Sequence, residues 1–397
     1  MQGTLFSRER VAGLHALVVG AGALGNEVIK NLALMGVGRL TILDRDRVER
    51  SNLTRSILFC TNDIEQHLAR GTAKADVAAA RAREINPDVA VSSHVGEIGD
   101  FGSGAIRRAD VVFSCLDNEM ARLELSWICN RLDRPLVDGG LGLINPSSGM
   151  VSLFPGSDGP CYACRRSAEQ RRTLLVDLQG RADPCGVKER ALREADIVAT
   201  TPVLASMIGA LQVETGLRFV CADGASRDRH HGLSYRLTLH PRMTLDTLRF
   251  DRSPNCPLHQ PESAVVAVDE HPDRRSTEWT AAELLEAVGG QPCFLHFDWP
   301  ITARAGCRTC GRQWEPMLRR ARFRRERCSA CASDDLVETE VLTGIDAASP
   351  WSRRSLAALG LPSGHVHEVV VGADADSPRR HVEVTGDLVP QTREAHA

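Results

Sequence analysis

The stretch that decides the fold is His15-Ala-Leu-Val-Val-Gly20-Ala-Gly-Ala-Leu-Gly25, which joins an apolar segment to a glycine-rich turn. Residues 15–20 are predicted to form a short buried strand, and apolar positions at helical spacing from Asn26 to Leu34 predict a helix. A second strand is expected at Leu40–Leu43. This order of strand, glycine turn, helix and strand predicts a right-handed crossover in a parallel sheet.

The alternation of strands and helices continues beyond this crossover. We expect a helix from Thr72 to Ile85, a strand from Val89 to His94 and a buried strand from Ala109 to Cys115. The segment from Leu136 to Phe154 is again strand-like, and Thr201 to Phe219 is predicted to be a long apolar helix. The predicted fold class is therefore α/β, with a Rossmann-like, doubly wound and mostly parallel sheet.

Composition excludes several classes of protein. The 397 residues are 43% apolar and 25% charged. No apolar run approaches the ~18 residues that span a bilayer. The 48 basic and 51 acidic side chains give a net charge of −3, so no overall field steers the chain toward nucleic acid or an anionic membrane. The charged segment Met1–Arg10 does not have the pattern of a secretory signal, so we expect a cytoplasmic protein.

A polar stretch after His259, with Pro261 and Pro272, predicts a boundary between two units. We expect the first domain to comprise residues 1–261 and the second to comprise residues 262–397. Within the first domain, the segment of about 165–199 is too polar to belong to the core. It is predicted to be a crossover loop that contains a surface helix.

Three glycines, Gly20, Gly22 and Gly25, form a G-x-G-x-x-G pattern between the first predicted strand and helix. Small residues there let backbone N–H groups approach phosphates, although a tight turn without a ligand has the same pattern. Ligands of doubly wound sheets bind beyond the carboxyl ends of the strands. Four polar residues are expected at that edge: Asp44, Asp46, Asp117 and Asn118. An acidic residue suits the ribose of NAD as well as that of ATP, so this pattern alone does not separate the two.

Cations near these strand ends favour ATP over NAD. The run from Asp44 to Arg55 contains several arginines, and Lys74 follows it. Hydride transfer has no use for such groups. Arginine and lysine around a nucleotide, with an aspartate able to hold Mg²⁺, suit the attack of a carboxylate on the α-phosphate. The chemistry indicated is adenylation.

These residues closely resemble the ThiF/MoeB/HesA family, the adenylating fold shared with ubiquitin-activating enzymes. The resemblance spans Leu5 to about His259. It rests on ordered motifs: the glycine loop, the Asp-x-Asp-x-Val-x-x-Ser-Asn-Leu-x-Arg run from Asp44, Lys74, Leu116-Asp117-Asn118, Cys161-Tyr-Ala-Cys164, the helix from Thr201-Pro-Val-Leu to Glu214, and Asn255-Cys256-Pro. It implies an adenylyltransferase that uses ATP and Mg²⁺.

The resemblance also implies roles for individual residues. Asp44 should hold the ribose and Asp117 the Mg²⁺, and phosphate contacts are implied for Asn52, Arg55 and Lys74. Arg8 matches an N-terminal arginine that family members insert into the partner subunit's ATP site, which implies a homodimer with two composite sites. Family members usually have glutamine after both arginines, whereas this chain has Glu9 and Ser56.

The thirteen cysteines favour metal binding or thiol chemistry over disulfides in a reducing compartment. In the second domain a four-thiolate zinc-ribbon pattern spans residues 307–331, with ligands Cys307, Cys310, Cys328 and Cys331. The alternatives are four unligated core thiols or a redox pair, but a redox Cys-x-x-Cys normally opens a helix. After the ribbon we expect a helix at Ser355–Pro362 and two closing strands.

A second metal site is implied by the resemblance. The pair Cys161-x-x-Cys164 and the pair Cys256-x-x-His259 match the family's four-ligand zinc site, with histidine as the last ligand. Three thiolates and one imidazole make an ordinary zinc site, whereas a surface role for His259 would leave it incomplete. The expected cofactors are thus ATP, Mg²⁺ and zinc at two sites.

Cys185 has no partner at metal-ligand spacing and lies in the predicted crossover loop. A helix predicted to begin just after it, with Lys188, Arg190 and Arg193 nearby, would stabilise a thiolate. The family places the cysteine that accepts the activated carrier in this loop, in the members that have one. Cys185 is therefore the expected nucleophile, and an incidental exposed thiol is the alternative.

Six arginines are clustered between the two cysteine pairs of the ribbon, within residues 319–327: Arg319, Arg320, Arg322, Arg324, Arg325 and Arg327. Contact with nucleic acid is one interpretation, because arginines and aromatic residues on a zinc ribbon can follow phosphates. A solvated face, or a dock for an acidic protein partner, agrees better with the nearly neutral charge of the chain.

Together these features predict a homodimer that adenylates the C-terminal glycine of a ubiquitin-like β-grasp protein, with Arg8, Arg55, Lys74 and Asp117 in the first step. Cys185 would then form a thioester for transfer to a conjugating enzyme. Alternatives are an enzyme that activates a sulfur carrier for thiamine, molybdopterin or cysteine synthesis, or one that modifies a peptide or a tRNA base. A scaffold without catalysis would not need the charged set, and a dehydrogenase has no role for it.

Overall fold

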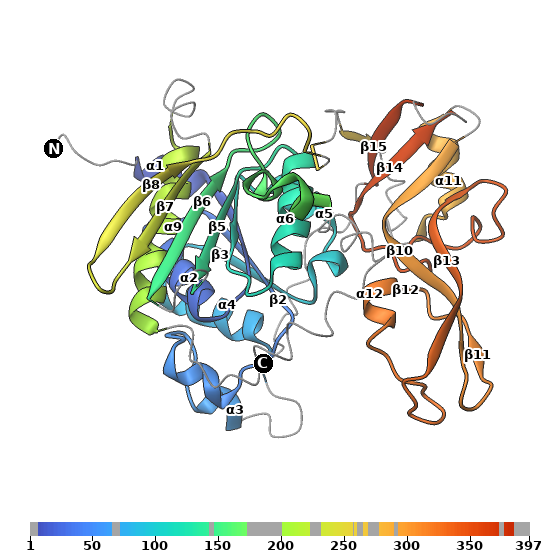
Figure 1. Ribbon diagram of the computed structural model, residues 1–397, viewed down its shortest axis with the longest axis horizontal. Helices are drawn as coiled ribbons and strands as arrows, with labels where there is room; N and C mark the ends of the chain where they lie inside the picture. Colours follow the sequence, from blue (N-terminus) through green and yellow to red (C-terminus); the bar gives the residue numbers. More distant parts are fainter. Residues whose placement is uncertain are drawn as a thin grey trace.

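The computed structural model describes residues 7–65, 72–142, 147–172, 201–222, 232–256, 258–259, 265–268, 278–289, 293–372 and 377–384. These residues form two sheets, one of eight strands and one of seven, which lie beside each other (Figure 1). The first sheet belongs to the N-terminal part of the chain and the second to the C-terminal part.

The first sheet has the strand order β3-β2-β1-β4-β5-β6-β7-β8. Its strands are β1 (His15–Val19), β2 (Arg39–Asp44), β3 (Ala90–Val95), β4 (Val111–Ser114), β5 (Leu136–Leu141), β6 (Ser148–Phe154), β7 (Leu233–Thr238) and β8 (Thr244–Arg249). The pairs from β3 to β5 are parallel, and those from β5 to β8 are antiparallel. The expected α/β fold with a mostly parallel sheet is confirmed.

Helices cover both faces of this sheet, as a doubly wound fold requires. One core contains buried side chains of α2 (Ala23–Met35), α4 (Lys74–Ile85) and α9 (Pro202–Val220). The opposite core contains those of α5 (Ser103–Arg108) and α6 (Glu119–Arg131). Shorter elements are α1 (Arg8–Gly13), η1 (Arg50–Thr54), α3 (Asn62–Glu65), η2 (Ile98–Asp100) and η3 (Tyr162–Arg165).

Helix α9 is long and apolar enough to cross a membrane by length and composition, but it packs inside the protein. Leu204, Ile208 and Leu217 are buried in the core that α9 shares with α2. Gln212 Nε2 donates hydrogen bonds to the carbonyl oxygens of Ser114 and Val137, at 2.9 and 2.8 Å. Because these bonds fasten α9 to β4 and β5, we interpret it as a core helix.

The second sheet contains β9 (Val265–Val268), β10 (Cys293–Cys307), β11 (Gln313–Trp314), β12 (Leu318–Arg319), β13 (Leu336–Asp346), β14 (Val366–Val371) and β15 (Arg379–Val384). Helices α11 (Ala281–Val288) and α12 (Arg320–Phe323) pack against β10. The two closing strands are confirmed, but the helix expected at Ser355–Pro362 is wrong. Hydrogen-bonded turns stand there, because Gly360, at a φ of +77°, and Pro362 end the segment within a few residues.

Helices α5 and α6 lie between the two sheets (Figure 1). Trp299 of β10 and Val366 of β14 belong to the same buried cluster as Ile106 and Ile128 of these helices. The two units thus share a core, in addition to the ion pairs described below. The boundary at residue 261 stays a prediction, since residues 260–264 lie outside the described chain.

Candidate functional site

The glycine loop connects β1 to α2, and its glycines differ in what surrounds them. A Cβ on Gly20, which has a φ of +97°, would lie 2.5 Å from the carbonyl oxygen of Cys115. A Cβ on Gly25 would lie 1.9 Å from the carbonyl oxygen of Gly20. Gly22, the N-cap of α2, has nothing within 4 Å of such an atom. Gly20 and Gly25 are thus needed for packing, and Gly22 leaves open space at a helix N-terminus that suits an anion.

Asp44, at the carboxyl end of β2, is hydrogen-bonded to this loop. One carboxylate oxygen accepts from the N–H of Ala21 at 2.6 Å, and the other accepts from the N–H of Asp46 at 2.7 Å. Burial raises the pKa of Asp44 above its ordinary value, while these two N–H donors counteract that rise. The carboxylate is therefore fixed beside the loop. Its expected contact with the ribose of ATP stays a prediction.

Lys74 begins α4 and its side chain is 11% exposed. Its Nζ lies 3.1 Å from Oδ2 of Asp46, and its backbone N–H donates to the carbonyl oxygen of Asp46 at 2.9 Å. The structure therefore brings together two of the residues that the sequence predicts for the site. A largely buried lysine beside an exposed carboxylate can neutralise phosphate charge.

Asp117 and Asn118 follow β4, at the same edge of the sheet. Asp117 is exposed, and its charge acts on Arg45. Asn118 is the N-cap of α6, and its side-chain oxygen accepts the N–H of Ala121 at 2.8 Å. The cap role occupies that oxygen, so the contribution of Asn118 to ligand binding stays a prediction.

Asn52 and Arg55 lie on and just after η1. Asn52 is buried, and its Oδ1 accepts the N–H of Glu49 at 2.9 Å. Arg55 caps the C-terminus of η1 through its backbone. Arg8 is exposed on α1, so entry into a partner's ATP site stays a prediction.

Sequence reasoning missed the buried side chains that support this edge. Arg122 Nη1 contacts both carboxylate oxygens of Asp138, at 2.8 and 2.9 Å, and its Nη2 donates to the carbonyl of Leu116. Asn26 contacts the glycine loop through its Nδ2, which donates to the carbonyl of Ala21 at 2.8 Å. The only sequence signal for these two residues is a charged or amide side chain at a core position of a helix. That signal has no clear meaning until the fold shows which partners the side chain meets.

The first cysteine cluster unites residues far apart in the sequence: Cys161, Cys164, Cys256 and His259. Their ligand atoms all lie within 4.8 Å of one another. Cys161 Sγ is 3.8 Å from Cys164 Sγ and 3.6 Å from Cys256 Sγ, close to the edge of about 3.8 Å of a tetrahedron with Zn–S bonds of about 2.3 Å. His259 Nε2 lies 3.2 Å from Cys164 Sγ. The residues fit a zinc ion, with His259 as fourth ligand.

The second cluster joins the two Cys-x-x-Cys pairs of the ribbon. Sγ of Cys307 lies 3.6 Å from that of Cys331, and Sγ of Cys310 lies 3.6 Å from that of Cys328. All four sulfur atoms lie within 4.8 Å of one another, in a donor set typical of structural zinc. The ion would hold the turn between β10 and β11 to the segment before β13.

Cys185 and the surface helix expected at Val187–Asp196 lie outside the described residues, as does most of the predicted crossover loop. Among the cysteines that the structure describes, Cys115 is beside the glycine loop but is buried, and burial raises its pKa well above the ordinary value. Such a thiol is a poor nucleophile. Cys60 is exposed.

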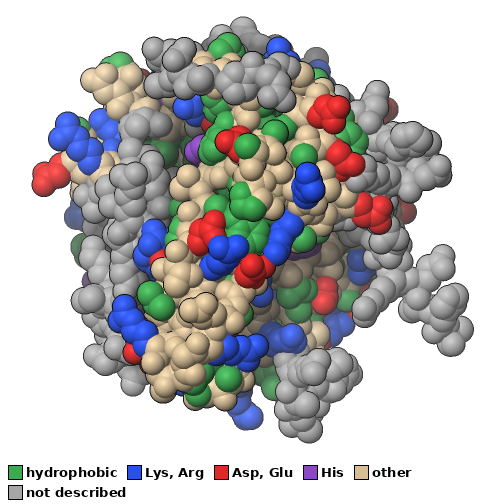
Figure 2. All heavy atoms as spheres, turned by 90° about the vertical axis from the view of Figure 1, so that its right-hand side faces the viewer, with side chains coloured by type: hydrophobic (Ala, Val, Ile, Leu, Met, Phe, Trp, Pro, Cys, Tyr) green, Lys and Arg blue, Asp and Glu red, His purple; other side chains and the backbone are tan. Residues whose placement is uncertain are grey.

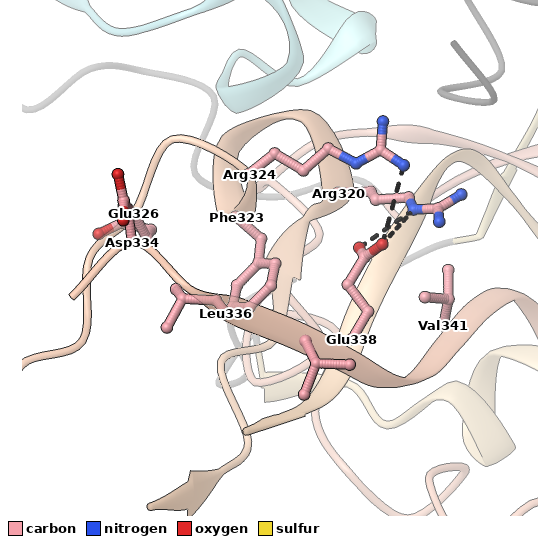
Figure 3. Close-up of a pocket in the computed structure, with 9 residues that line it drawn as sticks. Arg320, Phe323, Arg324, Glu326, Asp334, Leu336, Glu338 and Val341 are labelled. Carbon is pink, nitrogen blue, oxygen red and sulfur yellow. Dashed lines mark hydrogen bonds and ion pairs between the residues drawn. The ribbon is translucent and has the colours of Figure 1, made fainter. Parts of the chain in front are cut away.

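The arginines of the ribbon form ion pairs within the chain. Arg320 Nε lies 2.8 Å from a carboxylate oxygen of Glu338, and Arg324 Nη2 lies 3.8 Å from the same oxygen, beside a pocket of about 400 Å³ (Figure 3). On the face of the second sheet, basic and acidic side chains are interspersed (Figure 2). Arg320 and Arg324 are thus partly neutralised within the chain, and both the docking and the nucleic-acid interpretations stay predictions.

Comparison with known proteins agrees with this geometry. The SAMP-activating enzyme E1 of Haloferax volcanii is 30% identical over 262 residues, which are 63% of this chain and 81% of that protein. The ubiquitin-like modifier-activating enzyme 5 of Bombyx mori is 27% identical over 316 residues, which cover 76% of this chain and 71% of that protein. The sulfur carrier protein ThiS adenylyltransferase of Escherichia coli is 32% identical over 161 residues, 40% of this chain and 61% of its own.

The names of these relatives support an adenylyltransferase. A model of the ThiF family matches residues 5–258, which include the glycine loop, Lys74, Asp117 and the three cysteines of the first cluster. The chain therefore belongs to the ThiF family.

Proposed function

We propose that this chain is a homodimeric enzyme that uses ATP and Mg²⁺ to activate a ubiquitin-like β-grasp protein ending in glycine. The observation that carries the proposal is the meeting of three features at one edge of the sheet. These are the open helix N-terminus at Gly22, the Lys74–Asp46 pair and the exposed carboxylate of Asp117. The resemblance to enzymes that activate small carrier proteins supports the choice of substrate.

In the first step, an oxygen of the carrier's C-terminal carboxylate attacks the α-phosphorus of ATP. The bond between the α-phosphorus and its bridging oxygen breaks, and pyrophosphate leaves. The α2 N-terminus and Lys74, with Arg55 and the partner's Arg8, would stabilise the charge on the phosphoryl oxygens. Mg²⁺ held by Asp117 would supply further positive charge for pyrophosphate departure.

In the second step, the thiolate of Cys185 attacks the acyl carbon of the adenylate. AMP leaves, and a thioester remains on Cys185. A thioester keeps the acyl group reactive toward the cysteine of a conjugating enzyme. We place this chemistry in the cytoplasm, where reducing conditions keep the thiol and the zinc ligands available.

Activation of a sulfur carrier is the second candidate, and the likeness to ThiS adenylyltransferase favours it. The first step would be identical. The activated carboxylate would then receive sulfur rather than pass to a conjugating enzyme.

The test is carrier-dependent exchange of labelled pyrophosphate into ATP, with β-grasp proteins encoded beside this chain's gene. Wild type, Asp117→Ala and Cys185→Ala are compared, and each reaction is also run on a non-reducing gel. Cys60→Ser is the matched control, since Cys60 is an exposed thiol outside both cysteine clusters. We expect exchange to be lost in Asp117→Ala alone and the thiol-sensitive adduct to be lost in Asp117→Ala and Cys185→Ala. Absence of exchange in the wild type with every carrier would contradict the proposed function.

We further propose that the second unit recruits the conjugating enzyme. Deleting this unit would expose the core around Ile128 and Trp299, so the test keeps the full chain. Cys310→Ser with Cys331→Ser disturbs only the exposed ligands of the ribbon. We expect exchange to persist and transfer to the conjugating enzyme to fall. Unchanged transfer would refute the recruiting role.

A further inference from the structure

The arginines around α12 fall into two sets. Arg320 and Arg324 point toward Glu338 within the second unit (Figure 3). Arg319 and Arg325 instead reach acidic residues of the first unit. Arg325 Nη2 lies 2.7 Å from Glu97, and Arg319 Nη2 lies 2.7 Å from Glu124 of α6. The second set therefore connects the ribbon to the domain that contains the nucleotide site.

Arg319 holds this connection in place. Its guanidinium lies 4.1 Å from the ring centroid of Trp299, and a Cβ on Gly99 would lie 1.7 Å from its Nη1. Its side chain is only 11% exposed. An arginine enclosed between an indole ring and a glycine of η2 has little freedom, so α12 is firmly seated against η2.

Glu97 lies between the ribbon and the nucleotide site. It directly precedes η2, close to the carboxyl end of β3, and the N–H of Gly96 donates to the carbonyl of Asp44 at 3.2 Å. One oxygen of Glu97, Oε1, contacts both Nη2 of Arg325 at 2.7 Å and Nη1 of Arg45 at 2.9 Å. A single carboxylate oxygen is thus shared between the second unit and the loop after β2.

Arg45 lies at the edge of the first sheet where the nucleotide is proposed to bind. It stands between Asp44, which accepts from the glycine loop, and Asp46, which pairs with Lys74. Its Nε is 3.6 Å from Asp46, and the charge of Asp117 acts on it. Arg45 is therefore placed to contribute a cation to bound phosphate.

We propose that Glu97 is a positioning residue that couples the ribbon to the nucleotide site: Arg325 takes up part of its charge and so leaves the cation of Arg45 available to ATP. This inference rests on the proposed function. When Arg325 is removed, the charge of Glu97 is shared only between Arg45 and Arg319, whose Nη1 lies 4.0 Å from the other carboxylate oxygen. Glu97 then acts more strongly on Arg45, which is held away from the nucleotide and partly neutralised. The second unit thereby sets ATP affinity without touching ATP.

The experiment measures ATP binding to the full chain by calorimetry and the KM for ATP in the exchange assay. Arg325→Ala is expected to weaken ATP binding about two- to five-fold, the range set by a partly exposed ion pair, and to raise KM with kcat unchanged. Arg324→Ala is the matched control. It removes the same charge from the neighbouring position, but its partner Glu338 lies inside the second unit, so ATP binding should stay as in the wild type.

The decisive variant is Arg325→Ala combined with Glu97→Gln. Without the charge of Glu97, loss of Arg325 should no longer change ATP affinity relative to Glu97→Gln alone, and thermal melting of each variant checks that it is folded. The coupling would be overturned if Arg325→Ala weakened ATP binding equally in the wild type and in the Glu97→Gln background. It would also be overturned if Arg325→Ala had no effect on ATP binding in the wild type. If the wild type itself fails to bind ATP, the proposed function fails and not the coupling.

Discussion

The guanidinium of Arg131 donates two hydrogen bonds to Asp298, each 2.7 Å long, across the junction between the two sheets. Both side chains are almost fully buried, and Nε2 of His365 lies 3.1 Å from the same carboxylate. Burial alone would raise the pKa of Asp298, but the charges of Arg131 and His365 outweigh it and lower that pKa well below its usual range. The second unit is thus joined to α6 by a buried ion pair as well as by apolar contacts.

Asp298→Ala should destabilise the protein strongly, because it leaves the guanidinium of Arg131 buried without a counter-charge. A loss of about 3 to 5 kcal/mol in the free energy of unfolding is expected, measured by urea denaturation at pH 7.5. The matched control is Asp335→Ala, which breaks the exposed pair with Arg308 and should cost about 0 to 1 kcal/mol. Equal, small losses in both variants would show that the junction does not depend on this pair.

Acidification should reveal a buried histidine near the same junction. Burial, with the neighbouring His365, lowers the pKa of His367 to about 3. Between pH 6.5 and 3 the unfolded chain binds a proton at this position and the folded chain does not, so stability falls as the pH falls. At pH 5 this loss is about 2 kcal/mol relative to pH 7.5.

His367→Phe removes this linkage while it keeps a flat ring of similar size. We expect the difference in unfolding free energy between pH 7.5 and pH 5.0 to be smaller than in the wild type by about 2 kcal/mol. The measurement is urea denaturation at the two pH values. An unchanged pH dependence would mean that His367 titrates in the folded protein as it does in the unfolded chain.

Two glycines of the same loop should respond differently to alanine. Gly25→Ala puts a Cβ 1.9 Å from a backbone oxygen and should lower the melting temperature or prevent folding. Gly22→Ala meets nothing within 4 Å, so the chain should fold normally, but the methyl group then occupies space at the N-terminus of α2. A normal melting temperature with a KM for ATP raised about ten-fold or more is expected for Gly22→Ala. A normal KM for ATP in Gly22→Ala would mean that the phosphates of ATP do not bind at this loop.

What the sequence predicts well is local chemistry. The glycine spacing of the loop and the Cys-x-x-Cys spacing of the ribbon are set by backbone geometry and by ligand geometry, which short patterns retain. The pairs Arg131–Asp298 and Arg122–Asp138 join segments that meet only in the folded chain. In the sequence each of these residues therefore looks like an ordinary charged surface residue. The turn at Gly360 was missed because apolar spacing outweighed a nearby glycine and proline. The role of Cys185 stays a prediction, since it lies outside the described residues.

Metal analysis separates the two cysteine clusters. If both hold zinc, elemental analysis of the purified protein should give about two zinc ions per chain. His259→Ala should reduce this number toward one, because it removes the single nitrogen ligand, His259 Nε2, and leaves the first cluster with three thiols. Cys310→Ser should also reduce it toward one, through the other cluster. Cys60→Ser, which changes an exposed cysteine outside both clusters, should leave two. A value of one in the wild type that falls to zero in only one of the first two variants would assign zinc to that cluster alone.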